Sequence, residues 1–463
     1  MSTLRPIPGP IPDPAGAYDL TALGYTEQEF LLEGAAARYR LIGERTPDGR
    51  WLVEPAEPAP FATRLLLRRP ADDARYSGTV VVEWLNVSGG LDAAPDWMLT
   101  HTHLLRRGHA WAGVSAQRAG IEGGGLVPGM HLKAAHPQRY ARLTHPGDAW
   151  SFDIFSQAGR ALADLPELSP TRAGLASPRL LASGHSQSGT FLVTYVNAVD
   201  QVTPVFDGFL VHGRMGVGAA LDTGFNPAAR TPAERIRDDL RVPVIVLQTE
   251  TDVTLLGSGR ANQPDSELLR NWEIAGAAHA DTYLLFASGQ DDGTLPGTRL
   301  AELMRPTTDI LMGRTELPVN SGPQHHYVQC AAVEQLDGWV AGRTKPPSAP
   351  RLAVTEDGMD LRRDELGIGA GGIRTPWTDM PLAILSGTGQ RGEMFAFLFG
   401  TTRELSDAEV ARLYPGGRAD YLANFEAALD ASIRAGFLLT DDRAEILAVA
   451  AASWPADAPS LLP

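Results

Sequence analysis

Between residues 78 and 275 the chain alternates short, continuously apolar segments with longer segments of helical period. Strands this apolar need cover on both faces, which is the environment of a parallel sheet with helices on either side. The pattern therefore predicts one large, open, mostly parallel α/β sheet. Its strands are expected at residues 78–85, 110–115, 178–183, 205–212, 242–248 and 272–275, and its helices at residues 96–107, 150–165 and 190–199.

The segments before this sheet have a different pattern. Residues 1–17 hold five prolines and are predicted to form an extended arm. Residues 27–44 and 61–69 are rich in residues that favour strands, and a turn signal, Thr46-Pro47-Asp48-Gly49, divides them. We therefore expect an antiparallel opening before the parallel sheet.

The segments after the sheet change to helical period. A helix is predicted over residues 327–340, and the Pro-rich stretch at residues 343–350 marks a boundary. We expect a main α/β domain over residues 18–342, with cap insertions near residues 120–147 and 282–322. Residues 343–463 are expected to form a mostly helical extension that packs on the main domain, with helices at 406–413, 419–435 and 441–453.

Charge and composition narrow the classes of partner. The chain has 40 Lys plus Arg against 55 Asp plus Glu, a formal charge of −15, and nucleic-acid binding relies on Lys and Arg. The N-terminus lacks the apolar core of a signal peptide, and no run of about 18 apolar residues is present. Cys330 is the single cysteine, so no disulfide can form within the chain. We expect a cytoplasmic protein that binds neither nucleic acid nor membrane, and the sequence leaves its oligomeric state open.

The sequence GHSQSG, residues 184–189, connects a predicted strand directly to a predicted helix. A nucleophile elbow has this context, because the nucleophile takes a strained backbone angle at the strand end and small neighbours let the helix pack close behind. Gly184 fits the pattern, whereas Ser188 stands where a second glycine is expected, with Gly189 directly after it. Ser186 is therefore the candidate nucleophile, against the plainer interpretation of an ordinary strand-to-helix turn.

A serine hydroxyl needs a histidine base and an acid that orients the histidine, and in a fold of this type both follow the serine, acid first. The strand ending at residue 248 continues into TETD, where Asp252 is the first choice for the acid and Glu250 the reserve. His279 follows in a glycine turn after the next strand and is the candidate base. His325, at the entrance of a later helix, is the reserve base.

Acyl transfer also needs N–H donors aimed at the oxygen that becomes negative. One donor is expected from the backbone of Gln187, directly after the candidate nucleophile. The other is expected from the loop after the strand at 78–85, at Asn86 or Val87.

Aromatic and histidine side chains near the same sheet edge are candidates for substrate contact, although tryptophans at such positions are more often core residues. Glu83 is unusual in an apolar strand and is predicted to have a structural partner, because a buried carboxylate needs one. The candidates for substrate contact are Trp84, Trp150, His325 and His326.

Two further motifs resemble a nucleotide-binding loop and a metal-binding pair, but the residues around them do not fit either kind of site. Residues 386–392, SGTGQRG, contain the spacing G-x-G-x-x-G, but helices follow where a nucleotide-binding unit needs a second strand and an acidic residue. His101 and His103 are two positions apart in a predicted helix and do not share a face. We therefore expect neither a cofactor nor a metal.

Several segments together resemble one known family. They are EWLNVSGGLDAAPDW, HPGDAWSFDIFSQAGRAL, GHSQSG, TETD, GAAHAD and GGIRTPW. They are similar to the bacterial "alpha/beta hydrolase domain" family, within the α/β-hydrolase superfamily, and the similarity runs over nearly the whole chain. The resemblance implies an α/β-hydrolase fold and cleavage of a small-molecule carboxylic ester, with Ser186 as nucleophile, His279 as base and Asp252 or Glu250 as acid. An amidase, a lactonase or an acyltransferase would use the same residues, and a non-catalytic binding protein of this fold is the alternative from another class.

Overall fold

The computed structural model describes residues 2–12, 16–125, 127–169, 174–226, 232–310, 313–356, 358, 360–392 and 395–455. The chain divides into two compact units. The first comprises Met1–Val246, Arg260–Arg270 and Leu336–Lys345, and the second comprises Leu247–Gly259, Asn271–Gln335 and Pro346–Pro463. The chain enters the second unit for the last time at Pro346.

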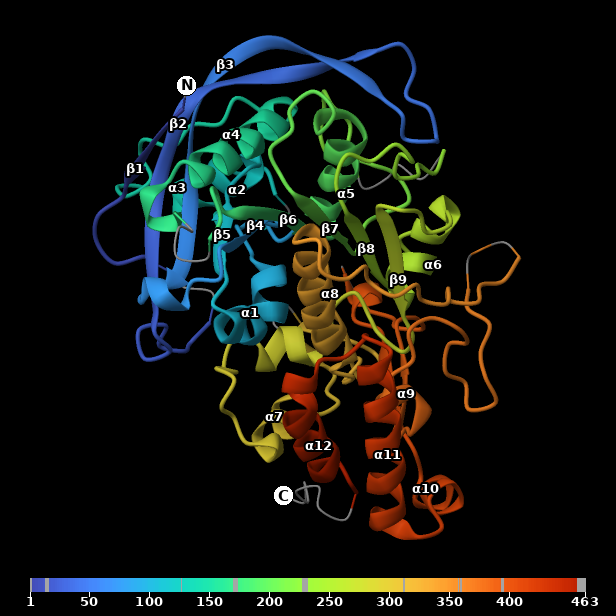
Figure 1. The fold of residues 1–463 in the computed structure, drawn as a ribbon. Coiled ribbons are helices and arrows are strands. Elements are labelled where there is room, and N and C mark those ends of the chain that lie inside the picture. The colour runs from blue at the N-terminus through green and yellow to red at the C-terminus, as the bar shows by residue number, and fades with distance from the viewer. Residues whose placement is uncertain are drawn as a thin grey trace. The chain divides into compact units, whose positions relative to one another are not determined.

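Nine strands form one sheet in the order β1-β2-β3-β5-β4-β6-β7-β8-β9 (Figure 1). β4, β5, β6 and β7 pair in parallel and are almost entirely buried, which confirms the predicted parallel sheet. β8 and β9 begin in the first unit and end in the second. The strands are β1 (Thr3–Pro6), β2 (Tyr25–Ile42), β3 (Leu52–Pro70), β4 (Thr79–Trp84), β5 (Ala110–Val114), β6 (Arg179–His185), β7 (Gly208–His212), β8 (Val244–Thr249) and β9 (Leu269–Ile274).

β2 and β3 form a long antiparallel hairpin, as the sequence predicted. The second strand was expected to begin at residue 61, but it begins at Leu52, which pairs with Ile42. β3 holds three prolines where the hairpin extends away from the rest of the sheet, because proline is tolerated where a ladder N–H is not needed. β1, inside the predicted N-terminal arm, pairs antiparallel with β2.

Helices cover both faces of the sheet in the first unit (Figure 1). α1 (Pro95–Arg107) lies on one face, and α4 (Ser151–Ala163) and α5 (Gln187–Thr194) lie on the other. α5 continues as a π-helical turn over Tyr195–Val199. Two short helices occur in or beside the expected insertion at 120–147: α2 (Arg118–Glu122) and α3 (Leu132–Ala135).

The second unit consists mainly of helices and connecting segments, and the three helices predicted at the C-terminal end are present. The unit also contains two small antiparallel sheets, one within the insertion expected at residues 282–322 and one within the expected helical extension. The second interrupts that extension because the apolar run before residue 386 forms a strand. None of the helices in the described part of the chain is long and apolar enough to cross a bilayer. The elements are α6 (Glu250–Thr254), α7 (Gly297–Leu303), α8 (Gln324–Val340), which ends in the first unit, α9 (Pro376–Asp379), α10 (Asp407–Leu413), α11 (Gly417–Arg434), α12 (Arg443–Ala452), and the strand pairs β10 (Asp309–Ile310) with β11 (Gly313–Arg314) and β12 (Ala383–Ser386) with β13 (Thr401–Glu404).

Candidate active site

Ser186 lies between β6 and α5 with φ 64° and ψ −119°. Among the described residues it is the one non-glycine residue with a positive φ. The N–H of Ser186 donates to the carbonyl oxygen of His212 at 2.9 Å. The carbonyl oxygen of Ser186 accepts from the N–H of Thr190 at 3.0 Å. A backbone conformation of this kind is strained by about 1–3 kcal/mol, and a strained strand-to-helix turn is the form of a nucleophile elbow.

The elbow depends on small residues because α5 begins very close to two strands. A Cβ on Gly189 would lie within 3.0 Å of the carbonyl oxygens of His212 and Gly184. Ser188 stands where a glycine was expected, and it is fully buried with its hydroxyl donating to the carbonyl oxygen of Leu85 at 3.2 Å. Gly189 therefore allows the close approach of the helix, and a serine is accommodated at position 188 because its hydroxyl has an acceptor.

The loop after β4 is hydrogen-bonded to the elbow. The side-chain amide of Asn86 donates to the carbonyl oxygen of His185 at 3.0 Å, and Ser88 Oγ donates to Gln187 Oε1 at 3.2 Å. The backbone N–H of Asn86 donates to the carbonyl oxygen of Ala93 at 2.8 Å, so this N–H is not available to a ligand.

Two of the three candidate N–H groups, those of Val87 and Gln187, therefore remain. The backbone hydrogen bonds of the described residues include none that is donated by Val87. Gln187 is the first residue of α5, where backbone N–H groups lack an acceptor within the helix. Val87 and Gln187 are therefore the two candidates whose N–H donates none of the described backbone hydrogen bonds.

A buried carboxylate network lies beside the elbow. Glu83 is fully buried and accepts hydrogen bonds from the N–H of Asp96 at 2.9 Å, the N–H of Trp97 at 2.8 Å and Trp111 Nε1 at 2.8 Å. Burial, and then the charge of Asp96, raises the pKa of Glu83 well above its ordinary value. Glu83 thus has the structural role expected from the sequence, because it caps the N-terminus of α1 and joins it to β4 and β5.

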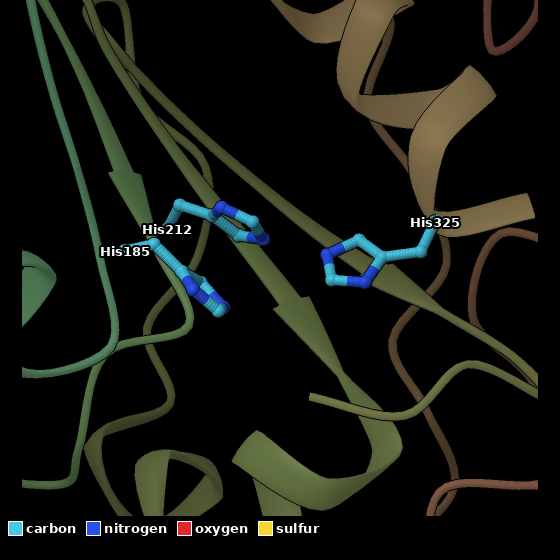
Figure 2. A group of neighbouring side chains, drawn as sticks. All are labelled: His185, His212 and His325. Atoms are coloured by element: carbon cyan, nitrogen blue, oxygen red, sulfur yellow. The ribbon is translucent and has the colours of Figure 1, made fainter. Parts of the chain in front are cut away.

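Two histidines lie at the ends of the strands that flank the elbow. Figure 2 shows His185, at the end of β6, beside His212, at the end of β7, with ring centroids 4.1 Å apart. His212 Nδ1 lies 2.8 Å from Asp96 Oδ1, and both side chains are buried. The carboxylate and the ring fix the position of β7, whose last carbonyl oxygen holds the backbone of Ser186.

The second unit holds a close acid–histidine pair. His279 Nδ1 lies 2.6 Å from Asp252 Oδ1, and both residues are buried. An ionised carboxylate can only accept, so Nδ1 carries the proton and Nε2 is left as the basic nitrogen. Asp252 Oδ2 accepts hydrogen bonds from the N–H of Thr249 at 2.7 Å and from its Oγ1 at 2.8 Å. The carboxylate is therefore held on both oxygens.

Glu250, the reserve acid, has its carboxylate elsewhere. Oε1 accepts from the N–H of Gly276 at 2.7 Å, and Oε2 accepts from the N–H of Gly387 at 2.8 Å and from Ser386 Oγ at 3.1 Å. The residue is fully buried, and that burial raises its pKa. Within this unit the partner of His279 is thus Asp252.

His325 and His326 begin α8, and Figure 2 labels the first of them at the start of this helix. His325 Nδ1 lies 3.7 Å from Asp281 Oδ2, which is too long for a hydrogen bond. His326 stacks on Tyr283 with ring centroids 4.0 Å apart. Of the two candidate bases, His279 has the carboxylate at hydrogen-bond distance.

The two tryptophans suggested for substrate contact are packed within the first unit. Trp84 is fully buried among Phe152, Phe155 and Phe191. Trp150 is partly buried, and its Nε1 donates to the carbonyl oxygen of Glu57 in β3 at 3.0 Å. These positions are those of core and packing residues, which the sequence analysis had favoured for tryptophans in general.

Several residues of these sites were not found from the sequence. Thr249 holds the acid, Asp96 and His212 support the elbow, and the turn after β12 binds Glu250. The only signal for the last was the Gly-rich motif after an apolar run, for which the sequence predicts no cofactor because a second strand and an acidic residue do not follow it.

Comparison with known proteins gives one match that covers nearly the whole chain. The model of a family described as "Alpha/beta hydrolase domain" matches residues 5–448. A search of curated proteins found no match.

Solved structures are similar at low identity. A thermostable esterase from Pseudomonas putida is 14% identical, with a TM-score of 0.29, over 56% of this chain and 75% of that chain. The esterase Est22 is 11% identical, with a TM-score of 0.32, over the same shares, 56% and 75%. A putative dienelactone hydrolase from Klebsiella pneumoniae is 14% identical, with a TM-score of 0.27, over 57% of this chain and 92% of that chain.

Proposed function

The chain belongs to the alpha/beta hydrolase domain family, and on that premise we propose that it is a serine hydrolase that cleaves carboxylic esters. Ser186 is the nucleophile, His279 the general base and acid, and Asp252 the carboxylate that orients the histidine. The N–H groups of Val87 and Gln187 stabilise the oxyanion. The substrate is a small molecule, and the reaction needs no cofactor.

The backbone of Ser186 is the observation that carries this proposal. A fully folded chain does not keep a non-glycine residue at φ 64° without a reason, since strain of this kind persists mainly at functional sites. Ser186 lies at the end of the parallel strand β6 and at the start of α5. The second support is the 2.6 Å pair of His279 and Asp252, which follows the serine in the chain in the order acid, then histidine.

The reaction then has two halves. His279 Nε2 takes the hydroxyl proton of Ser186 while Oγ attacks the ester carbonyl, and the imidazolium gives that proton to the departing alcohol as the C–O bond breaks. The remaining acyl-enzyme is attacked by water, which His279 deprotonates, and the carboxylic acid leaves as Ser186 regains its proton. Asp252 stays ionised throughout and keeps the proton on Nδ1.

Two measurements test the proposal together. We expect a fluorophosphonate probe to label the protein at Ser186 and not to label Ser186→Ala, and we expect release of p-nitrophenol from p-nitrophenyl esters with a burst of one equivalent if deacylation is slow. No label at Ser186 together with no ester turnover would favour a non-catalytic binding protein of this fold.

The same residues serve related reactions, which a substrate panel separates. Esters of increasing chain length, matched anilides, lactones and an alcohol acceptor should be compared at equal concentration. Higher kcat/KM for an anilide or a lactone, or transfer of the acyl group to the alcohol in preference to water, would assign the protein as an amidase, a lactonase or an acyltransferase instead.

A further inference from the structure

Glu250 and the turn at Ser386–Gly387 are hydrogen-bonded to the two segments that carry the acid–histidine pair, α6 with Asp252 and the turn with His279. We propose that they are positioning residues, which set the geometry of the acid–histidine pair without touching the reacting atoms. The inference rests on the proposed function, in which this pair activates Ser186. It assigns a role to the Gly-rich segment after β12, whose spacing resembles a nucleotide-binding motif.

The carboxylate of Glu250 joins three segments of the second unit. It accepts hydrogen bonds from the N–H of Gly276, which begins the turn before His279, and from the N–H of Gly387. The backbone N–H of Glu250 in turn donates to the carbonyl oxygen of Ala277 at 3.1 Å. One fully buried side chain thus connects the start of α6, the His279 turn and the segment after β12.

A second chain of hydrogen bonds ends on the backbone of His279. Thr251 Oγ1 donates to the carbonyl oxygen of Gly387 at 2.6 Å, and it accepts from the N–H of His279 at 3.1 Å. Gly387 therefore binds the two residues that follow β8: its N–H donates to the Glu250 carboxylate, and its carbonyl oxygen accepts from the Thr251 hydroxyl. The backbone of the proposed base depends on a residue more than a hundred positions later in the chain.

The segments around Glu250 are closely packed at two glycines. A Cβ on Gly387 would lie within 3.0 Å of the Ala277 carbonyl oxygen, Glu250 Cβ and the Thr251 N–H. A Cβ on Gly369 would lie equally close to Glu250 Oε1. Backbone atoms of Gly276, Gly369 and Gly387 lie around the Glu250 carboxylate, which leaves it little space to move.

The turn before His279 is also held from its other side. Asn320 Nδ2 donates to the carbonyl oxygens of Gly276 at 2.9 Å and Ser386 at 3.0 Å, and Gln324 Nε2 donates to Gly276 O at 2.7 Å. Arg363 donates to Ser386 Oγ at 3.3 Å and to Thr388 Oγ1 at 2.7 Å. Asn320 and Gln324 thus hold the turn before His279, and Asn320 and Arg363 hold the segment after β12 that binds Glu250.

Glu250→Gln is the sharpest test, because it keeps the size of the side chain and replaces one acceptor oxygen by an NH2 group that must face a backbone N–H. Displacement of a catalytic group by about 1 Å costs on the order of 100-fold in rate. We expect kcat to fall about ten- to hundredfold with KM within about twofold. Thr251→Val, which removes the link between Gly387 and the His279 N–H, should lower kcat in the same range.

Glu273→Gln is the matched control. Glu273 is a buried glutamate of the same unit that also accepts a backbone N–H, from Leu352 at 2.7 Å, and its Oε1 accepts from Arg351 at 3.4 Å. We expect it to lower thermal stability about as much as Glu250→Gln while kcat stays within about twofold of the wild type.

A readout that does not need turnover separates this inference from the proposed function. The short Nδ1–H···Oδ1 bond of His279 and Asp252 should give a proton resonance far downfield, identified by its loss in His279→Ala. We expect that resonance to shift or broaden in Glu250→Gln and to stay in Glu273→Gln. Should the wild type cleave no ester, this resonance still tests the positioning role. Unchanged resonance and unchanged kcat in folded Glu250→Gln would overturn it.

Discussion

The two parts of the proposed active site are built in different ways. The elbow of the first unit is local: β6, Ser186 and α5 are consecutive in the chain, and the strained φ of one residue presents the hydroxyl. The acid–histidine pair of the second unit is non-local. Asp252 and His279 follow different strands, and a segment after β12 holds both of their loops. Strain places the nucleophile, whereas hydrogen bonds between distant segments place the base.

This difference has a consequence for mutation. A local turn under strain depends on the absence of side-chain bulk at Gly184 and Gly189, so it should tolerate changes far away. A non-local pair depends on each of the contacts that join its loops, so it should be sensitive to residues that never meet a substrate. The following changes test the contrast.

The largest effect is expected for Ser186→Ala, which removes the nucleophile. We expect kcat to fall on the order of 10⁶-fold, as for the loss of a nucleophile that acts as part of a triad. Ser186→Gly should be equally inactive but more stable to heat, because glycine relieves about 1–3 kcal/mol of backbone strain. Thermal melting of the two variants measures the strain, and equal melting temperatures would argue against a strained elbow.

The next test replaces each of the two candidate bases, His279 and His325, by alanine. His279→Ala should lower kcat by a similar factor, on the order of 10⁶, because Nε2 is the proposed proton acceptor. His325→Ala should stay within about tenfold of the wild type, since its nearest carboxylate, Asp281, is at 3.7 Å. If esterase assays show the reverse ranking, His325 is the base.

Asp252→Asn should lower kcat about 10⁴-fold while the protein stays folded. The asparagine amide can no longer hold the proton on Nδ1, so the wrong nitrogen of His279 faces the serine. The comparison with Glu250→Gln, expected at about ten- to hundredfold, separates the acid from the residue that positions it. A larger loss in Glu250→Gln would identify Glu250 as the acid.

Two glycine substitutions, one in the elbow and one beside the acid–histidine pair, compare the two parts of the proposed site directly. Gly189→Ala and Gly387→Ala each place a Cβ within 3.0 Å of backbone atoms, so both should destabilise the protein, by about 1–3 kcal/mol as for overpacked sites. At temperatures where both are folded, Gly387→Ala should also lower kcat about tenfold, because its neighbours are Glu250 and Thr251. Melting curves and kcat measured on the same samples distinguish a loss of folded protein from a loss of geometry.

The smallest effect concerns Glu83 and pH. Burial raises its pKa in the folded protein, so the native state binds that proton more tightly than the unfolded chain. The resulting stability is fully present below the unfolded pKa of about 4.3 and is lost as pH rises through the raised pKa. Glu83→Gln does not titrate, so its free energy of unfolding should fall less between pH 4.3 and higher pH. Denaturant unfolding over a pH series checks this, and parallel curves would contradict it.

Local sequence patterns predicted the parallel sheet and the Ser186 elbow well. The continuous apolar segments led to the parallel sheet, and GHSQSG placed Ser186 between a strand and a helix, because an elbow is made by neighbours in the chain. The same reasoning missed the first part of β3, before residue 61, since the sequence does not show which ladder positions need an N–H. It also offered Asn86 as an oxyanion donor, and the pairing of its N–H with Ala93 appears only in three dimensions.

The sequence by itself determined the fold class and the order of Ser186, Asp252 and His279, because hydrophobic periodicity and a strand-to-helix turn are properties of neighbouring residues. Only the tertiary structure decided that His279 pairs with Asp252 and not with Glu250, and that a Gly-rich segment more than a hundred residues later holds both loops. Glu250 and Asp252 carry the same chemical group two positions apart. Their roles differ because one side chain meets an imidazole and the other is enclosed by backbone N–H groups from distant segments.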